Sequence, residues 1–389
     1  MNSDVLVYDV ETTISNKGNP FDETNKLCYV GLGSGSNTHL FSIEYDDNPF
    51  GDNLSSIQAM VNSHEVIVGF NIKFDLHWGR RYGISFSSIR VWDCQLVHFI
   101  LTGQENTYPS LNGVAAHYNL GTKFDVVSSD YWKNGIDTPD IPRDILEEYL
   151  KGDLDLTYQV YLKQKEEVEK ASPQLKRLIS LHNQDLVVLE EMEFNGLLFD
   201  EDKSNELAID NEKHIEILDQ RLFDYHLCPE FNPNSGEHLS ALLYGGSIKL
   251  RRREVIGVFK TGERAGQQKE RWVDYEVPFD KLVNPIKGSE LAKEGYYSTD
   301  EQTLKTLKGS KKAKEVIELI LTRATVEKRV STYYRGLIKL RTEMNWIKGK
   351  LHGQLNQCVA RTGRLSSSKP NLQNFDGEIK ELFGSQYEN

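Results

Sequence analysis

The chain has 389 residues, of which 38% are hydrophobic and 27% are charged. This length suggests two or three domains, and the composition excludes both a low-complexity disordered chain and a membrane-spanning one. The N-terminus has no basic stretch typical of a signal peptide, and the four cysteines form no CxxC pair. We therefore expect a cytoplasmic protein without a zinc site.

The net charge of −12 is unevenly distributed. Residues 1–170 contain 13 basic and 25 acidic side chains, whereas residues 171–389 contain 33 of each. Within the second part, residues 305–350 contain 13 basic and four acidic residues, and residues 249–271 contain eight and three. Such segments can neutralise the phosphates of a nucleic acid, but a solvated helix face has the same composition.

The first 170 residues alternate between predicted strands and helices. Short apolar runs predict strands at 5–8, 29–32, 39–43 and 66–70. Amphipathic patterns predict helices near 54–62, 74–82, 93–101 and 144–168. Strands that come first as a meander and then alternate with helices indicate an α/β domain with a mixed sheet.

From Pro173 the pattern changes to long helices. One is predicted at 174–194, where Gly196 would end it as a left-handed C-cap, and another at 311–344. Ser298–Asp300 resembles a helix N-terminus. The polar, β-like segment 245–281 predicts an exposed, hairpin-rich insertion.

Four carboxylates and a tyrosine lie on these predicted elements or directly after them. Asp9 and Glu11 follow the first apolar run on one face of the strand, with Cα atoms roughly 6–7 Å apart. Two such carboxylates repel unless a cation lies between them, and their hard oxygens suit Mg²⁺ or Mn²⁺. Asp75 falls in the first turn of a predicted helix, and Tyr149 lies four residues before Asp153 on another. Taken singly, each is also common as a surface or helix-end residue.

In this order and on these elements, the five residues resemble the three exonuclease motifs of the DEDD superfamily, in its tyrosine-bearing branch. The histidine branch would have His where this chain has Glu148. The resemblance implies a ribonuclease H-like fold and a 3′→5′ exonuclease that hydrolyses a phosphodiester with two divalent cations, Mg²⁺ or Mn²⁺.

The resemblance also implies a role for each residue. Asp9 would bridge both cations, Glu11 and Asp153 would bind one, and Asp75 would reach the other through water. Tyr149 would orient the attacking water, since its unperturbed pKa of about 10 makes it a poor base.

Four further polar or aromatic residues lie near these motifs in the sequence. The resemblance implies that Asn71 and Phe74 contact the frayed 3′ end of single-stranded DNA. Asp93 and Asp155 are interpreted instead as a helix N-cap and a surface charge.

The second half resembles part of another family. Residues 189–200 resemble the opening of the thumb in family A DNA polymerases, and residues 231–235 and 297–300 match later thumb motifs more loosely. Residues 360–374 closely resemble the polymerase segment that grips the minor groove of the primer–template, where contacts do not read sequence. The resemblance implies that duplex DNA is contacted by the residues Arg364, Asn371, Gln373 and Asn374. The basic helix 311–341 would contact duplex phosphates.

These resemblances predict the domain organisation and fold class. The fold class is α/β, with a ribonuclease H-like exonuclease domain at 1–172, a mainly helical thumb at 173–345 with a polar insertion near 245–281, and the start of a palm at 346–389. Residues 378–383 resemble the approach to the first palm aspartate, and no palm aspartate motif or fingers helix follows them. We therefore expect no nucleotide addition by this chain alone.

The leading hypothesis is the N-terminal portion of a phage-type family A DNA polymerase. It would provide proofreading during DNA replication and bind single-stranded 3′ ends and primer–template duplex, in the cytoplasm of a bacterial host if phage-encoded. Palm and fingers would come from a second polypeptide, and no membrane would be involved. The alternatives are a stand-alone 3′→5′ exonuclease with a relic thumb and a non-catalytic DNA-binding subunit.

Overall fold

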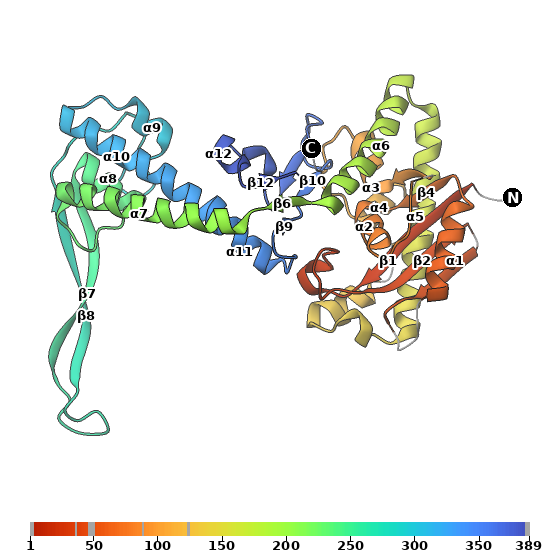
Figure 1. Cartoon of the computed structure of the whole chain (residues 1–389), viewed down its shortest axis with the longest axis horizontal. Helices are drawn as coiled ribbons and strands as arrows, with labels where there is room; N and C mark the ends of the chain where they lie inside the picture. The colour runs from red at the N-terminus through yellow and green to blue at the C-terminus, as the bar shows by residue number, and fades with distance from the viewer. Residues whose placement is uncertain (1–3, 36, 46–50, 88, 123–124, 386–389) are drawn as a thin grey trace. The chain divides into compact units, whose positions relative to one another are not determined.

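The computed structural model describes residues 4–385 apart from 36, 46–50, 88 and 123–124, so part of the N-terminus considered above lies outside the described residues (Figure 1). The chain forms two compact units. The discontinuous unit combines Met1–Glu201 with Ile338–Asn389, and the central unit is Asp202–Leu337. These divisions do not coincide with the boundaries expected after residues 172 and 345.

The discontinuous unit is built on a five-stranded mixed sheet, as expected, with strand order β3-β2-β1-β4-β5. Strands β1, β2 and β3 are antiparallel, whereas β4 and β5 run parallel to β1. The strands span Val5–Thr12 (β1), Leu27–Ser34 (β2), Asn37–Ser42 (β3), Val66–Gly69 (β4) and Arg90–Asp93 (β5). Strand β5 was not predicted, because it has only two apolar residues, Val91 and Trp92, between charged ones and so forms no apolar run.

Helices cover both faces of this sheet, so β1 is almost continuously buried. Leu6, Tyr8 and Val10 pack with α1, α2 and α3, whereas Val5 and Val7 pack with α4 and α5 on the other face. The helices span Gly51–Asn62 (α1), Lys73–Arg81 (α2), Cys94–Leu101 (α3), Leu111–His117 (α4) and Arg143–Lys170 (α5). Alternation along β1 therefore assigns each side chain to one of two cores.

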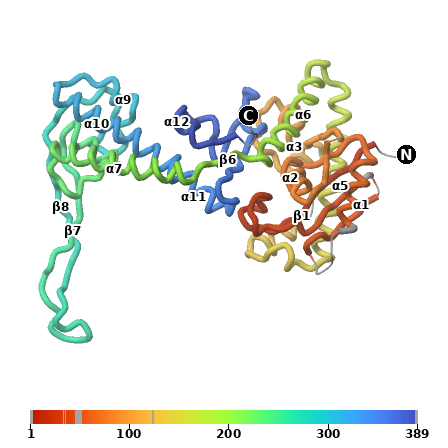
Figure 2. The backbone as a smooth tube through the Cα atoms, in the orientation of Figure 1, coloured from red at the N-terminus to blue at the C-terminus, as the bar shows by residue number. Residues whose placement is uncertain are grey.

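Helix α6 (Pro173–Asn195) belongs to the discontinuous unit, since Ile179 and Leu186 join the core of the sheet. After it, β6 (Leu197–Phe199) pairs with both β9 (Lys350–Leu351) and β12 (Phe383–Gly384). Strands β10 (Gln354–Asn356) and β11 (Ser366–Ser368) form a second small ladder, and α12 spans Gly377–Lys380. Figure 2 shows this C-terminal segment beside α6.

Gly196 ends α6 with φ 65° and ψ −167°, which corrects the expected left-handed cap. Its φ is positive, but its ψ is extended. A Cβ atom at this position would lie 2.8 Å from the carbonyl oxygen of Leu351. Glycine is therefore required here because β9 approaches the backbone closely.

The central unit is mainly helical, with a core formed by α8, α9, α10 and the base of a hairpin. Its helices are α7 (Glu201–His226), α8 (Gly236–Tyr244), α9 (Glu301–Thr306), α10 (Lys311–Lys328) and α11 (Arg335–Glu343), of which α7 and α11 continue into the discontinuous unit. A π-helical turn at Arg329–Tyr334 joins α10 to α11, so the predicted helix 311–344 is continuous but not regular. Asp300 caps α9, as expected, by accepting from the backbone N–H of Thr303.

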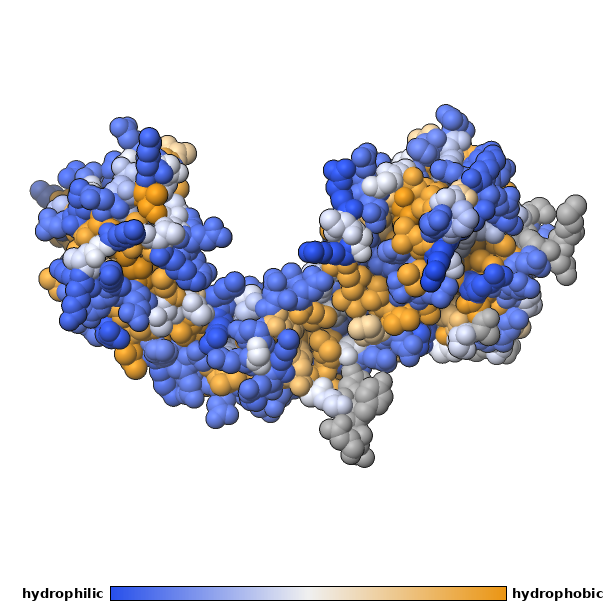
Figure 3. Space-filling view, turned by 90° about the horizontal axis from the view of Figure 1, so that it is seen from above, coloured by the Kyte–Doolittle hydropathy of each residue, from blue (hydrophilic) through white to orange (hydrophobic). Residues whose placement is uncertain are grey.

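The predicted insertion is a single long hairpin, formed by β7 (Gly246–Val258) and β8 (Gln268–Phe279). It extends away from the helices of its own unit (Figure 1). In the space-filling view of Figure 3, the visible face is mostly hydrophilic, with smaller groups of hydrophobic residues. None of the described helices is long and apolar enough to cross a membrane. All four cysteines are free and buried.

Candidate active site

Strand β1 carries the first two predicted carboxylates. It extends to Thr12, so Asp9 and Glu11 lie within the strand rather than beyond its end. Strand alternation puts them on the same face as Val5 and Val7, which is the face covered by α5. The register between β1 and β2 shifts directly after Glu11, which ends the regular pairing at the site.

Helix α5 supplies Tyr149 and Asp153, and it packs very close to the sheet. A Cβ atom on Gly31, the partner of Asp9 in β2, would lie only 2.8 Å from Leu154 Cδ1. The absence of a side chain at Gly31 therefore lets α5 approach the sheet. Tyr149 and Asp153, one helical turn apart, reach the same cavity as Asp9.

Three carboxylates form a compact group. Asp9, Glu11 and Asp153 each offer an oxygen within 4.8 Å of the other two. Glu11 and Asp153 are buried, and Asp9 is half-buried. They line a cavity of about 500 Å³ in which Lys17 is the sole cationic side chain among the described lining residues. The cavity therefore carries a surplus of negative charge that favours cation binding.

Asp75 lines the same cavity from the first turn of α2, outside the three-carboxylate group. Its Oδ1 atom accepts a hydrogen bond from the backbone N–H of Val10 at 3.1 Å, which ties α2 to β1. Burial, together with the charge of Asp9, raises the pKa of Asp75 well above its usual value. All five residues predicted to be catalytic thus line one cavity.

Tyr149 lies in the cavity as a neutral phenol. Burial raises its pKa, and the charges of Asp153 and Glu11 raise it further. Its ring packs edge-on against Trp132, whose indole N–H donates to Thr138 Oγ1 at 3.1 Å. Thr138 is fully buried and donates in turn to the backbone oxygen of Thr12.

Sequence reasoning missed Trp132 and Thr138. They lie in two short 3₁₀ turns, Trp132–Asn134 and Thr138–Asp140, where no hydrophobic period marks buried side chains. Asp137 caps the second turn, and Pro139 follows inside it, which is a recognisable N-terminal pattern. That pattern predicts a turn but not a contact with the catalytic tyrosine.

Asp93 has the capping role predicted for it, and it also holds a loop of the site. It caps α3 by accepting from the backbone N–H groups of Gln95 and Leu96. It also accepts from the N–H groups of Asn71 and Ile72, both at 3.1 Å. These bonds fix Asn71 with a positive φ of 58° beside the cavity.

Three further residues near the site were given a role from the sequence: Asn71, Phe74 and Asp155. Asn71 and Phe74, predicted to contact a 3′ end, both line the carboxylate cavity. Asp155 is exposed on α5 and accepts a local hydrogen bond from Gln159 at 2.7 Å, consistent with a surface charge.

The four residues predicted to bind the minor groove lie on the exposed segment around β11. Gln373 donates to the backbone oxygen of Leu365 at 2.8 Å, and Asn371 caps the 3₁₀ turn Leu372–Asn374. Arg364 and Asn374 are also exposed. None of the four lines the carboxylate cavity.

Several basic residues of 305–350 are neutralised within the protein. Arg323 is buried and paired with Asp219, and Arg335 forms two hydrogen bonds with Glu212 at 2.9 and 3.0 Å. In the discontinuous unit, Arg341 pairs in the same bidentate way with Glu201. The charge surplus of this segment is therefore smaller at the surface than the sequence predicts. Exposed lysines remain at Lys308, between α9 and α10, and at Lys311, Lys312 and Lys314 at the start of α10.

Comparisons with known proteins agree with the resemblance of the second half of the chain to family A DNA polymerases. The sequence model of the family described as "DNA polymerase family A" matches residues 275–387. The chain is 29% identical over 324 residues to DNA polymerase I of Synechocystis sp., covering 80% of this chain and 28% of that protein. It is 22% identical to the DNA polymerase of Bacillus phage SP01, covering 95% of this chain and 42% of that one.

A solved structure extends the likeness to the fold. The POL domain of Pol1 from M. smegmatis, in complex with DNA primer–template and dNTP, matches with a TM-score of 0.62 and 14% identity over 97% of this chain and 53% of that one. The chain spans less than half the length of the two curated relatives described above. Together these comparisons show that the chain is similar to family A DNA polymerases, over residues 275–387 in the family model and over most of its length in the two relatives.

Proposed function

We propose that this chain is a 3′→5′ exonuclease that hydrolyses the terminal phosphodiester of DNA as part of a family A DNA polymerase system. The observation that carries the proposal is the group formed by Asp9, Glu11 and Asp153, whose oxygens lie within 4.8 Å of one another. The strand order β3-β2-β1-β4-β5, with three antiparallel strands and two parallel ones, supports a ribonuclease H-like domain.

The donor set fits divalent cations of the Mg²⁺ or Mn²⁺ type. Four carboxylates face one cavity against a single lysine, and carboxylate oxygens are the ligands these ions prefer. Asp9, Glu11 and Asp153 would hold one cation, and Asp9 with Asp75 would serve a second. When bound, such cations neutralise the scissile phosphate and lower the pKa of a bound water.

The side chains of the protein position the reacting groups. Tyr149 stays protonated, so it is suited to orienting the attacking water through its hydroxyl rather than to removing a proton as a phenolate. Asn71 offers an amide for the sugar or phosphate of the last nucleotide, and Phe74 offers an aromatic face for its base.

Duplex binding is the second part of the proposal. Arg364, Asn371, Gln373 and Asn374 are exposed on one segment that the family A match includes. Exposed lysines at the start of α10 would bind backbone phosphates without regard to sequence. The expected second polypeptide with palm and fingers is not supported by any of the comparisons and stays a prediction.

The experiment uses the full chain with Mg²⁺ and a 5′-labelled primer that carries a mismatched 3′ terminus on its template. We expect stepwise shortening of the primer that EDTA stops, and loss of at least 10³-fold in rate for Asp9→Ala and for Asp153→Ala. Asp155→Ala is the matched control, since Asp155 is exposed two residues from Asp153 on the same helix.

Three results would contradict the proposal. Shortening that survives both Asp9→Ala and Asp153→Ala would rule out this site. Metal-independent DNA binding without any hydrolysis by the wild-type chain would instead favour the non-catalytic DNA-binding subunit. Cleavage of circular single-stranded DNA would show an endonuclease, because a circle offers no 3′ end.

A further inference from the structure

Lys17 supplies the positive charge of the carboxylate cavity. Among the described residues that line this cavity of about 500 Å³, it is the sole cationic side chain, against Asp9, Glu11, Asp75 and Asp153. It also lines an adjoining cavity of about 330 Å³ in the same discontinuous unit. Lys17 therefore lies where the two cavities meet.

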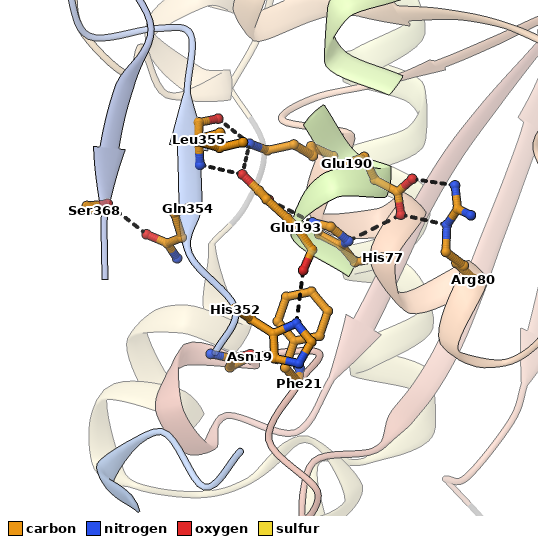
Figure 4. Close-up of polar contacts among 11 residues, drawn as sticks. Asn19, Phe21, His77, Arg80, Glu190, Glu193, His352, Gln354, Leu355 and Ser368 are labelled. Carbon is orange, nitrogen blue, oxygen red and sulfur yellow. Dashed lines mark hydrogen bonds and ion pairs between the residues drawn. The ribbon is translucent and has the colours of Figure 1, made fainter. Parts of the chain in front are cut away.

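The charge of Lys17 is not used inside the protein, in contrast to that of Lys73. The Lys73 ammonium donates to a carboxylate oxygen of Glu193 and to the backbone oxygen of Leu355, both at 2.6 Å. In Figure 4, Glu193 also contacts His77 Nε2 and the backbone N–H of Leu355. Among the described residues, no carboxylate forms an ion pair with Lys17. Lys73 thus serves the fold, whereas the Lys17 ammonium is available to a ligand.

The loop 13–26, between β1 and β2, holds Lys17 in a costly backbone conformation. Lys17 has a φ of 61°, and it lies between Asn16 with 46° and Gly18 with 66°. Left-handed backbone is unfavourable for a side chain as long as that of lysine, and it persists where surrounding contacts enforce it. Such positions are most common at functional sites.

Hydrogen bonds on both sides of Lys17 enforce this conformation. The indole N–H of Trp78 donates to the backbone oxygen of Gly18 at 3.0 Å, in the buried part of the loop. Asn16 Nδ2 donates to Asp22 Oδ2 at 2.7 Å. The backbone of Lys17 is therefore fixed close to the end of β1, while its side chain stays exposed at the cavity.

Hydrolysis of a phosphodiester needs positive charge beside the reacting phosphate. The oxygen of the attacking water bonds to phosphorus while the bond to the 3′ oxygen of the preceding nucleotide breaks, and the electron pair leaves on that oxygen. The water gives up a proton to solvent, and the departing oxygen takes one up. An ammonium beside the phosphate stabilises the negative charge that builds up in the transition state. Lysine can supply it because it binds phosphate as a compact point charge.

We propose that Lys17 is a further catalytic residue of this site, and that its ammonium contacts a non-bridging oxygen of the scissile phosphate. The inference rests on the proposed exonuclease and adds a positive charge that the protein itself supplies. The fixed loop positions the backbone of Lys17, and the exposed side chain reaches the ligand without first breaking an ion pair.

The first measurement tests the phosphate contact without hydrolysis. The full chain with Mg²⁺ is titrated calorimetrically with thymidine 5′-monophosphate. We expect Lys17→Met, which keeps the length of the side chain and removes its charge, to weaken binding about tenfold. Lys17→Arg keeps a cation, so it should retain most of the affinity.

The second measurement follows the shortening of a 5′-labelled, mismatched primer with Mg²⁺. Lys17→Met should lower kcat by about 100-fold with little change in KM, because it removes one charge that stabilises the transition state. Lys17→Arg should recover most of this loss. Lys17→Gly should be as impaired as Lys17→Met without unfolding at a lower temperature, because glycine adopts a left-handed φ at no steric cost.

Lys26→Met is the matched control, since Lys26 ends the same loop, is exposed and lines neither cavity. It should match wild type in both measurements. The proposal is overturned if Lys17→Met leaves kcat unchanged, if it leaves monophosphate binding unchanged, or if the wild-type chain does not bind the monophosphate. Binding that depends on Lys17, in a chain that hydrolyses no primer, would contradict the proposed exonuclease and still support the phosphate contact.

Discussion

Tyr149 meets Trp132 edge-on, with ring centroids 5.7 Å apart and planes at 81°. Trp132 is in turn anchored through Thr138 to the backbone of Thr12, one residue beyond Glu11. The tyrosine and the carboxylates are therefore positioned by the same end of β1. An edge-on aromatic pair is worth about 0.5–1.5 kcal/mol beyond its buried area, so the contact favours this orientation of the phenol.

Tyr149→Phe removes the hydroxyl and keeps the ring. We expect kcat for primer shortening to fall by about 100-fold, with little change in KM, because the water loses an orienting partner. Burial and neighbouring carboxylates raise the pKa of Tyr149, so the wild-type rate should show no phenol ionisation between pH 6 and pH 9.5. The measurement is kcat against pH for both proteins. An ionisation in that range that disappears in Tyr149→Phe would make the tyrosine an ionising base instead.

Asp93→Ala should loosen the loop that carries Asn71. The change leaves the N–H groups of Asn71, Ile72, Gln95 and Leu96 without their acceptor. Burial raises the pKa of Asp93 to about 6, so removing its charge offsets part of this loss. We expect a net destabilisation of about 2–4 kcal/mol in urea unfolding, since each unsatisfied group costs about 1–3 kcal/mol. An unchanged midpoint of urea unfolding would show that water accepts hydrogen bonds from these N–H groups in place of the carboxylate.

His352 should make the stability of the discontinuous unit depend on pH. Burial lowers its pKa to about 4, against an opposing effect from its bond to the backbone oxygen of Glu193. As pH falls below 6.5, the unfolded chain takes up a proton at His352 and the folded protein does not. Stability is therefore lost between pH 6.5 and about pH 4, by about 2 kcal/mol at pH 5.

The measurement compares urea unfolding of wild type and His352→Phe at pH 7 and pH 5. Phenylalanine keeps a ring to stack on Phe21 but cannot titrate. Its change in unfolding free energy between the two pH values should be about 2 kcal/mol smaller than that of wild type. Glu193 and Glu190 have lowered pKa values, so their contribution is lost only as pH falls further, below their unfolded value of about 4.5. Equal pH dependence in both proteins would refute the assignment.

Lys311→Ala combined with Lys312→Ala should weaken duplex binding equally for all sequences. Both lysines are exposed, unlike the arginines of the same segment that pair internally. Each phosphate contact contributes about 0.9 to the slope of log Kd against log salt, so the slope should fall by about two. The control is Lys163→Ala with Lys170→Ala, two exposed lysines of α5. If Kd changes while the slope of log Kd against log salt does not, the lysines affect the stability of the fold and do not contact phosphates.

The sequence predicted that the candidate residues would lie together, because the strand and helix periods fix the directions in which their side chains point. Alternation along β1 put Asp9 and Glu11 on one face, and i, i+4 spacing put Tyr149 above Asp153. The distance between β1 and α5 was not predictable, because it depends on Gly31 meeting Leu150 and Leu154 across 120 residues of chain. Counting charges along residues 305–350 overestimated the positive charge at the surface for the same reason. Arg323 and Asp219 form an ion pair that only the tertiary structure brings together.

The sequence did not predict the cavity of about 330 Å³ that Lys17, Phe21 and Lys369 line. Its aromatic, amide and lysine residues come from segments as distant as Lys17 and Lys369, and none belongs to a recognisable pattern except Asn71 and Phe74. Glu193 was predicted only as part of the helix 174–194, where a buried carboxylate looks like any surface one. Positive φ values at Asn16, Lys17 and Tyr108 follow from surrounding contacts rather than from residue type.

The pairing of Phe383 with Phe199 has a consequence for the order in which the protein forms during synthesis. Strand β6 leaves the ribosome long before β12, and the whole central unit is made between them. The central unit can therefore fold while the edges of β6 are still uncovered. Until residues 350–384 emerge, Lys73 of α2 and Glu193 of α6 cannot form their hydrogen bonds with the backbone of Leu355 in β10.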